Sequence, residues 1–269
     1  MKNSSLKVIL PALVAALVSQ TAFAADTAEE KELQDMSDPL AVFSQFGVGY
    51  TDRGLNIKYG KSYDPGVENT MAMNIVELKG FLGEDIGFSQ IVEEDNSIDS
   101  FRFRNFKVDM TNGRGNQIDI AYDIETDTAN ASYSFIQALP KWGRVQFFPI
   151  LGAGVTIQND AIDSIENGEK VIDEGYSMTG TYTVAGMYSK VTITDNIWFN
   201  YNPMFLSSLS GSDFYKDNAY GMGNSDILLH EVALSYQINP RSNVRYFANF
   251  SDEVNYKDGE HRIEYNYQF

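Results

Sequence analysis

The sequence predicts an all-β fold, a transmembrane antiparallel up-and-down β-barrel of about 12 strands, with roughly 10 or 14 strands as alternatives. Three observations predict this class: an apolar leader, a long series of segments in which apolar and polar residues alternate, and a last segment that ends on Phe269. Alternation with a period of two indicates strands with one apolar and one polar face.

The N-terminus has the pattern of a secretory signal peptide. Lys2 and Lys7 precede an apolar run of 11 residues, Val8–Val18, and Ala22–Ala24 supplies a small-x-small cleavage pattern. We therefore expect residues 1–24 to be removed after Ala24, because the apolar run is too short to cross a bilayer as a helix. No later stretch approaches about 18 consecutive apolar residues, so a membrane would have to be crossed by strands.

The last eight residues, Arg262–Phe269, alternate strictly. One face carries Ile263, Tyr265, Tyr267 and Phe269, and the other carries Glu264, Asn266 and Gln268. A strand that ends the chain on Phe resembles the C-terminal signal of Gram-negative outer-membrane β-barrel proteins. The resemblance implies an outer-membrane location and recognition of Tyr265, Tyr267 and Phe269 by the outer-membrane assembly machinery.

Alternating segments fill the chain between its two ends. Twelve are expected: residues 55–59, 71–82, 86–92, 101–108, 117–124, 131–135, 144–157, 181–189, 197–202, 228–238, 244–250 and 262–269. The apolar set of each is expected to face lipid. Residues 42–50 also alternate, and they would either extend the first strand or enter the lumen. The expected organisation is a signal peptide at 1–24, a periplasmic arm at 25–41 and the barrel at 42–269.

The connections between segments have two sizes. The short ones are residues 111–115, 140–143, 194–196 and 239–242, and the long acidic ones are 159–176, 208–225 and 251–261. Short and long connections alternate, which is typical of tight periplasmic turns and longer extracellular loops. A periplasmic β-sandwich, the alternative fold, does not require this asymmetry.

Composition narrows the chemistry. The chain has no Cys and a formal net charge of −17, which excludes a disulfide framework and thiolate metal sites and disfavours nucleic acid as a partner. The expected partners are outer-membrane lipid and lipopolysaccharide, which divalent cations can bridge to acidic groups, together with small solutes. No cofactor is expected.

Ten charged side chains lie opposite the apolar sets and are expected to point into the lumen. They are Lys58, Glu77, Lys79, Arg102, Arg104, Asp119, Asp123, Glu231, Arg245 and Glu264. One interpretation is a set of ion pairs that fills a narrow barrel, and the other is a charged lining that selects among solutes. Among these residues, Arg102 and Arg104 are the favoured candidates for selectivity.

These features favour a small passive, porin-like channel for small solutes. The alternative is a non-conducting surface barrel whose acidic loops serve adhesion or envelope integrity, and a barrel enzyme is less favoured still. His230 and His261 are the only two histidines, and neither forms a recognisable catalytic dyad or metal site. The sequence therefore names no catalytic residue and no metal ligand.

Overall fold

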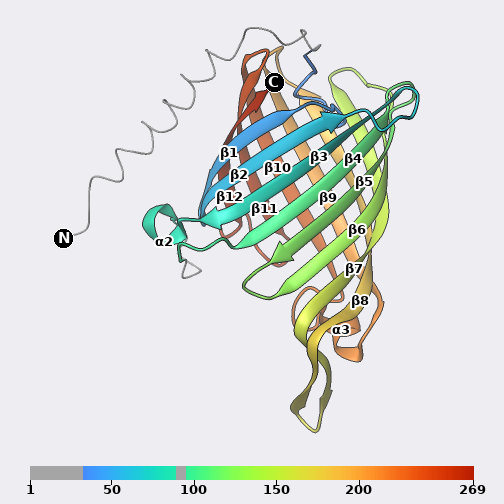
Figure 1. Cartoon of the computed structure of the whole chain (residues 1–269), viewed down its shortest axis with the longest axis vertical. Coiled ribbons are helices and arrows are strands. Elements are labelled where there is room, and N and C mark those ends of the chain that lie inside the picture. The colour runs from blue at the N-terminus through green and yellow to red at the C-terminus, as the bar shows by residue number, and fades with distance from the viewer. Residues whose placement is uncertain (1–32, 89–94) are drawn as a thin grey trace, which may run out of the picture. The chain divides into compact units, whose positions relative to one another are not determined.

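The computed structural model describes residues 33–88 and 95–269, and within them 12 antiparallel strands close into a barrel (Figure 1). The strands are β1 (Gln45–Thr51), β2 (Gly54–Tyr63), β3 (Thr70–Phe81), β4 (Ser100–Asp109), β5 (Arg114–Asp123), β6 (Thr128–Gln137), β7 (Val145–Glu166), β8 (Glu169–Thr192), β9 (Ile197–Gly211), β10 (Asp226–Asn239), β11 (Ser242–Ser251) and β12 (Glu260–Gln268). Each strand pairs with its neighbour in sequence, and β1 pairs with β12 to close the sheet. The predicted fold class is confirmed. The expected signal peptide and residues 25–32 of the expected arm lie outside the described residues.

One expected strand is wrong and another replaces it. Ile86, the first residue of the expected third segment 86–92, ends the short helix α2 (Gly83–Ile86), and the N–H of the next residue, Gly87, donates to the carbonyl of Gly83 at 2.8 Å. Leu82, with φ of 62°, turns the chain out of β3 just before this helix. Residues 89–94 lie outside the described part. The twelfth strand is instead β1, which the sequence left undecided.

The barrel has two unlike ends. The C-terminus and the connections 64–69, 110–113, 138–144, 193–196 and 240–241 lie at one end. The opposite end carries α2, the helix α3 (Asp213–Asn218) and the tip of the β7–β8 hairpin (Figure 1). Short turns at one end and longer connections at the other are the usual asymmetry of outer-membrane barrels, in which the short turns are periplasmic. None of the helices in the described residues is long and apolar enough to cross a membrane.

The long loop expected at 159–176 is mostly strand. β7 and β8 stay paired up to Glu166 and Glu169, far beyond their pairing with β6 and β9, and form a ribbon that projects from the barrel (Figure 1). Its tip is Asn167-Gly168, with φ of 52° and 87°. Asn-Gly is the preferred pair for a two-residue hairpin turn with two positive φ values, so the turn chemistry explains why this acidic stretch is a hairpin.

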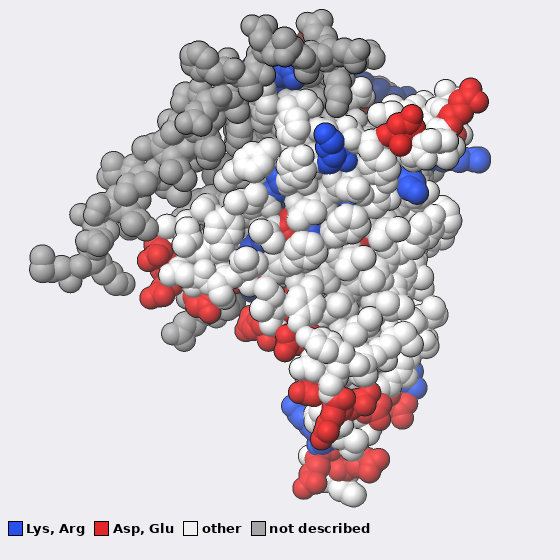
Figure 2. Space-filling view, in the orientation of Figure 1, with Lys and Arg blue, Asp and Glu red and all other residues white. Residues whose placement is uncertain are grey.

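The outer surface of the barrel is apolar between its two ends. Figure 2 shows few charged atoms on the visible flank and clusters of acidic atoms on the projecting hairpin. Exposed outward-facing side chains include Tyr59, Ile118, Phe135, Leu151, Tyr236 and Ile263. Closure of the sheet removes open edges whose backbone groups would be unsatisfied in hydrocarbon, and the apolar belt matches the outer surface to lipid.

Candidate functional site: the barrel interior

Glycines occupy the middle of the inner face of β1, and the space they leave lets charges from both neighbouring strands meet. Its inward residues include Gly47 and Gly49. A Cβ at Gly47 would lie 3.0 Å from Cε of Lys58, and one at Gly49 would lie 3.0 Å from Cδ of Arg262. Glycine therefore leaves the space in which Lys58 of β2 and Arg262 of β12 lie across β1.

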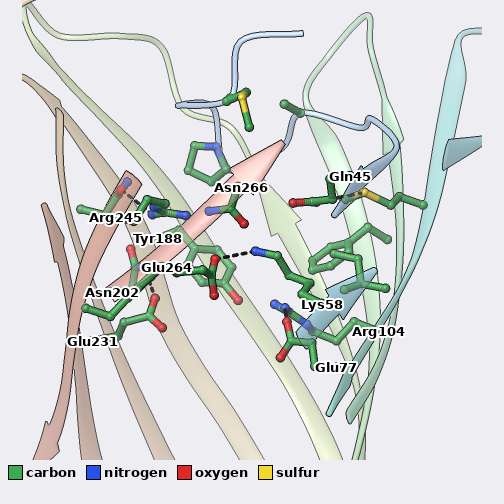
Figure 3. A pocket seen from close by; sticks show the side chains of 18 of the residues that line it. Gln45, Lys58, Glu77, Arg104, Tyr188, Asn202, Glu231, Arg245, Glu264 and Asn266 are labelled. Atoms are coloured by element: carbon green, nitrogen blue, oxygen red, sulfur yellow. Dashed lines mark hydrogen bonds and ion pairs between the residues drawn. The ribbon is translucent and has the colours of Figure 1, made fainter. Parts of the chain in front are cut away.

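Ion pairs bind these charges into a network (Figure 3). Lys58 Nζ lies 2.7 Å from Oε1 of Glu264, and Arg262 Nε lies 3.4 Å from the other oxygen of Glu264. Arg104 pairs with Glu77, and Arg102 forms a two-point pair with Asp119 on the next strand. Breaking such a buried pair by removing one partner usually costs about 3–5 kcal/mol.

Arg245 is held without a carboxylate partner among the described residues. Its guanidinium donates to Oγ of Ser235 and to Oδ1 of Asn200, both at 3.0 Å. It also lies 4.5 Å from the ring centroid of Phe247, and Arg262 lies 4.4 Å from the same ring. The ring therefore contacts two guanidinium groups and stabilises each through a cation–π contact.

Three cavities follow one another inside the barrel. The first, of about 360 Å³, lies at the end that carries the termini of the barrel, and the second, of about 1000 Å³, is lined by residues of the opposite end such as Asp52 and Val254. The third, of about 370 Å³, lies against β5–β9. All three share Lys79, Arg102 and Tyr188 as lining residues. These three residues mark the junction at which the cavities meet.

A segment before β1 closes part of the first cavity. Leu40 and Val42 are buried in an apolar cluster with residues of β3, β4, β6 and β7, including Phe148. Asp35 Oδ2 lies 2.9 Å from Lys190 Nζ, and Gln268 Nε2 donates to the carbonyl of Gln34 at 3.0 Å. Residues 34–44, here called the N-terminal segment, thus pack inside one mouth of the barrel.

The hydrogen-bond ladder between β8 and β9 is interrupted. Paired residues stop at Gly186 with Met204 and resume at Val191 with Phe199. Side chains fill the gap, here called the β8–β9 seam. Ser189 Oγ accepts from Tyr201 N–H at 3.1 Å and donates to Tyr201 O at 2.5 Å, and Asn202 Oδ1 and Asn200 Nδ2 bond the backbone of Ser189.

The structure places all ten charged residues expected in the lumen around the three cavities. Eight line the first cavity, Asp119 lines the third and Asp123 lines the second. Their proposed part in selectivity remains a prediction. Sequence reasoning missed Arg262 and Glu260, although both share the parity of Glu264 in the last strand and could have been found from it.

On β8, the expectation that the apolar set faces lipid is wrong. Tyr182, Val184 and Tyr188 face the lumen, where they line the third cavity. Thr181, Thr183 and other small residues, which alternate with them along the strand, point away from the lumen. Alternation along a strand shows which face is apolar, but it does not show whether that face points to lipid or to the lumen. The lumen has an apolar wall of its own, and β8 forms part of it.

The two histidines lie in aromatic clusters near the end that carries the longer connections. His230 Nδ1 lies 2.9 Å from the hydroxyl of Tyr201, and its ring stacks on Phe250 at 4.9 Å between centroids. His261 Nδ1 lies 2.8 Å from the hydroxyl of Tyr246. Both contacts fit the role of interfacial residues at a membrane boundary.

Fold and interior together define an outer-membrane β-barrel of the Gram-negative type: a closed antiparallel barrel, an apolar belt outside and paired charges around cavities inside. No family model matches the chain. No curated protein matches it either.

Three of the solved structures that match are covered almost over their whole length. The NanC porin is 8% identical, with a TM-score of 0.49 over 84% of this chain and 98% of that one. The KdgM porin in complex with disordered oligogalacturonate is 11% identical, with a TM-score of 0.43 over 85% and 99%. The translocator domain of the autotransporter NalP from Neisseria meningitidis is 12% identical, with a TM-score of 0.41 over 95% and 97%. At these values no solute and no residue role passes from them to this chain.

Proposed function

We propose that the protein is a small passive channel for small solutes in the outer membrane. One observation carries the proposal: cavities lie toward both ends of the barrel interior, and all three are bordered by Lys79, Arg102 and Tyr188. A lumen lining that carries positive and negative side chains can discriminate among solutes by charge, above all at the few residues that border every cavity.

The favoured selectivity residues sit at this junction or beside it. Arg102 borders all three cavities, and Arg104 borders the first two. Each is paired with a carboxylate, so neutralising Arg102 or Arg104 would leave Asp119 or Glu77 uncompensated. We expect the ion preference of the channel to move toward cations after either change.

The test is single-channel conductance of the refolded signal-free protein in a planar bilayer. Reproducible steps, and a reversal potential in a KCl gradient that moves toward cation preference in Arg102→Gln, support the proposal. Arg114→Gln is the matched control, because Arg114 is the first residue of β5 and lines none of the three cavities. A folded barrel that never conducts contradicts the proposal and favours the alternative of a non-conducting surface barrel. The acidic β7–β8 hairpin is the feature that this alternative would use.

A further inference from the structure

We propose that the cavity junction binds small zwitterions that carry an apolar side group, the chemical class of apolar amino acids and short peptides. The inference rests on the proposed channel function and names its solute. Three features around the junction carry it: hydrogen-bond donors that hold no carboxylate, carboxylates that form no ion pair within the described residues, and an apolar wall between them.

The donors are Lys79 and Tyr188, which border all three cavities. Neither makes an ion pair or a side-chain hydrogen bond with another residue in the part of the chain that the structure describes, whereas Lys58, Arg102, Arg104 and Arg262 all hold carboxylates. An ammonium group inside a barrel is costly without a counter-charge. Glu77 and Glu260 lie near Lys79 without an ion pair to it in the described part of the chain, so a solute carboxylate at this position would add a direct partner and accept from both donors.

The second cavity supplies acidic groups for the other end of a zwitterion. Its lining includes Glu231 and Asp123, and closer to the mouth Glu253 and Asp258. Glu231 accepts a hydrogen bond from Asn202 at 2.7 Å, and within the described residues it has no cationic partner. Glu231 also borders the first cavity, so its carboxylate lies close to the junction.

The apolar wall lies on the side of the lumen formed by β7–β10. Val184, Met204, Leu206 and Leu229 line the third cavity, which also contains Lys79 and Tyr188. An apolar side group placed there leaves water, and each methylene group buried contributes about 0.8 kcal/mol. The charged wall and the apolar wall thus border one space.

A solute with one charge fits this arrangement less well. A simple anion meets Glu253, Asp258 and other carboxylates of the second cavity before it reaches Lys79. A simple cation is attracted there but gives Lys79 no direct ion-pair partner at the junction. A zwitterion satisfies both regions without adding net charge to the lumen, and this selects it over either analogue.

The experiment compares four probes in block of KCl conductance and in swelling of liposomes that contain the protein. Leucine is the test solute, 4-methylpentanoate lacks its ammonium group, 3-methylbutylamine lacks its carboxylate, and glycine lacks its side group. We expect leucine to block at the lowest concentration and to permeate faster than a zwitterion of its size would by diffusion alone. Permeation that follows size alone, with the same block by all four probes, overturns the inference while KCl conductance still upholds the channel.

Variants assign the preference to residues. Lys79→Met should raise the half-blocking concentration of leucine about tenfold, the usual effect of one charge-assisted hydrogen bond, and leave that of 3-methylbutylamine unchanged or lower it. Lys79→Arg should restore the preference in part. Leu206→Asn combined with Leu229→Asn should remove the preference for leucine over glycine. Lys107→Met is the control, because Lys107 is exposed and lines none of these cavities. Equal effects of the Lys79 and Lys107 variants would contradict the assignment.

Discussion

Lys58 of β2 reaches across the whole of β1 to place its Nζ 2.7 Å from Glu264 of β12. The two strands are not neighbours, and only the glycines on the inner face of β1 leave room for the contact. The ion pair therefore lies over the place where the first and last strands close the barrel.

Filling this space should destabilise the closed barrel. In Gly47→Leu the new side chain would occupy the path of Lys58, and forced repacking of this kind usually costs about 1–3 kcal/mol, with the lost ion pair added. Urea unfolding of the refolded protein, followed by heat modifiability on a gel, measures the loss. Ala131→Leu adds similar bulk at an outward position of β6 and should change stability far less. Equal losses would show that the space over β1 has no special role.

Removing one partner of the pair should cost more than removing both. Glu264→Gln leaves Lys58 and Arg262 without their shared carboxylate, so we expect a larger loss of stability than for Lys58→Met. The double variant should recover part of the loss, because an uncompensated buried charge accounts for most of the cost of breaking such a pair. A double-mutant cycle of unfolding free energies measures the coupling. Strictly additive losses would contradict a direct interaction.

The N-terminal segment should restrict current through the mouth that it occupies. Leu40 packs in the apolar cluster of the first cavity, so Leu40→Asn should weaken docking and raise the mean conductance or the rate of switching between conductance levels. Leu33→Asn is the control, because Leu33 is exposed and lies outside the cluster. Single-channel recordings distinguish the two, and identical traces would mean that the segment does not obstruct the path.

As the pH is lowered into the acid range, the docking of the N-terminal segment should change in two steps of opposite sign. Burial raises the pKa of Asp38 above its usual 3.8, so docking should strengthen as the pH falls toward 3.8 and Asp38 becomes neutral. Burial also acts to raise the pKa of Asp35, but hydrogen bonds from Ser37 and Lys190 outweigh it and lower that pKa below 3.8. The contribution of Asp35 is therefore present above 3.8 and is lost as the pH falls through its lowered pKa.

Conductance recorded against pH checks this order. Asp38→Asn should remove the first phase, and Asp35→Asn should remove the second. The Asp35 carboxylate is largely exposed, so its ion pair with Lys190 should contribute at most about 1 kcal/mol. A single phase that persists in both variants would count against the assignment.

The β8–β9 seam should be weakened by a change of one atom. Ser189→Ala removes the hydroxyl that bonds both the N–H and the carbonyl of Tyr201, which leaves two backbone groups unsatisfied at a cost of about 1–3 kcal/mol each. Hydrogen exchange of the Tyr201 amide should accelerate. Ser235→Ala tests the effect of losing a buried hydroxyl elsewhere in the sheet, and Tyr201 exchange should stay unchanged there.

Much of the fold could be predicted from the sequence because strand alternation and turn residues are local signals. The approximate strand count and the two unlike ends follow from them. The identity of the strands was less certain: residues 42–50 and 86–92 carry comparable patterns, and only closure against β2 and β12 decides for β1. The pair Asn167-Gly168, however, is a hairpin-turn signal that could be recognised in the sequence, and it shows that an acidic stretch can be a hairpin.

The sequence could predict which side chains point into the barrel interior, but it could not predict which of them contact one another. Parity placed the charged residues around the lumen, yet the pairing of Lys58 with Glu264 depends on Gly47 in a third strand. Lys79 forms no ion pair within the described residues although it resembles Lys58 in sequence context, and this difference depends on how the closed barrel places the strands of both lysines. The lumen-facing apolar set of β8 likewise follows only from the closed sheet.

The projecting β7–β8 hairpin separates the outermost part of the chain from the barrel that anchors it. Beyond Gln158 and before Gly180 the two strands pair only with each other within the described residues, and a hydrogen bond of 2.8 Å between Tyr122 and Tyr176 ties the base of the hairpin to β5. Foreign sequence inserted at Asn167-Gly168 would interrupt no contact between the hairpin and the remaining strands. The tip is thus a natural display position, at which an epitope or an affinity tag can be presented while the barrel keeps its closure.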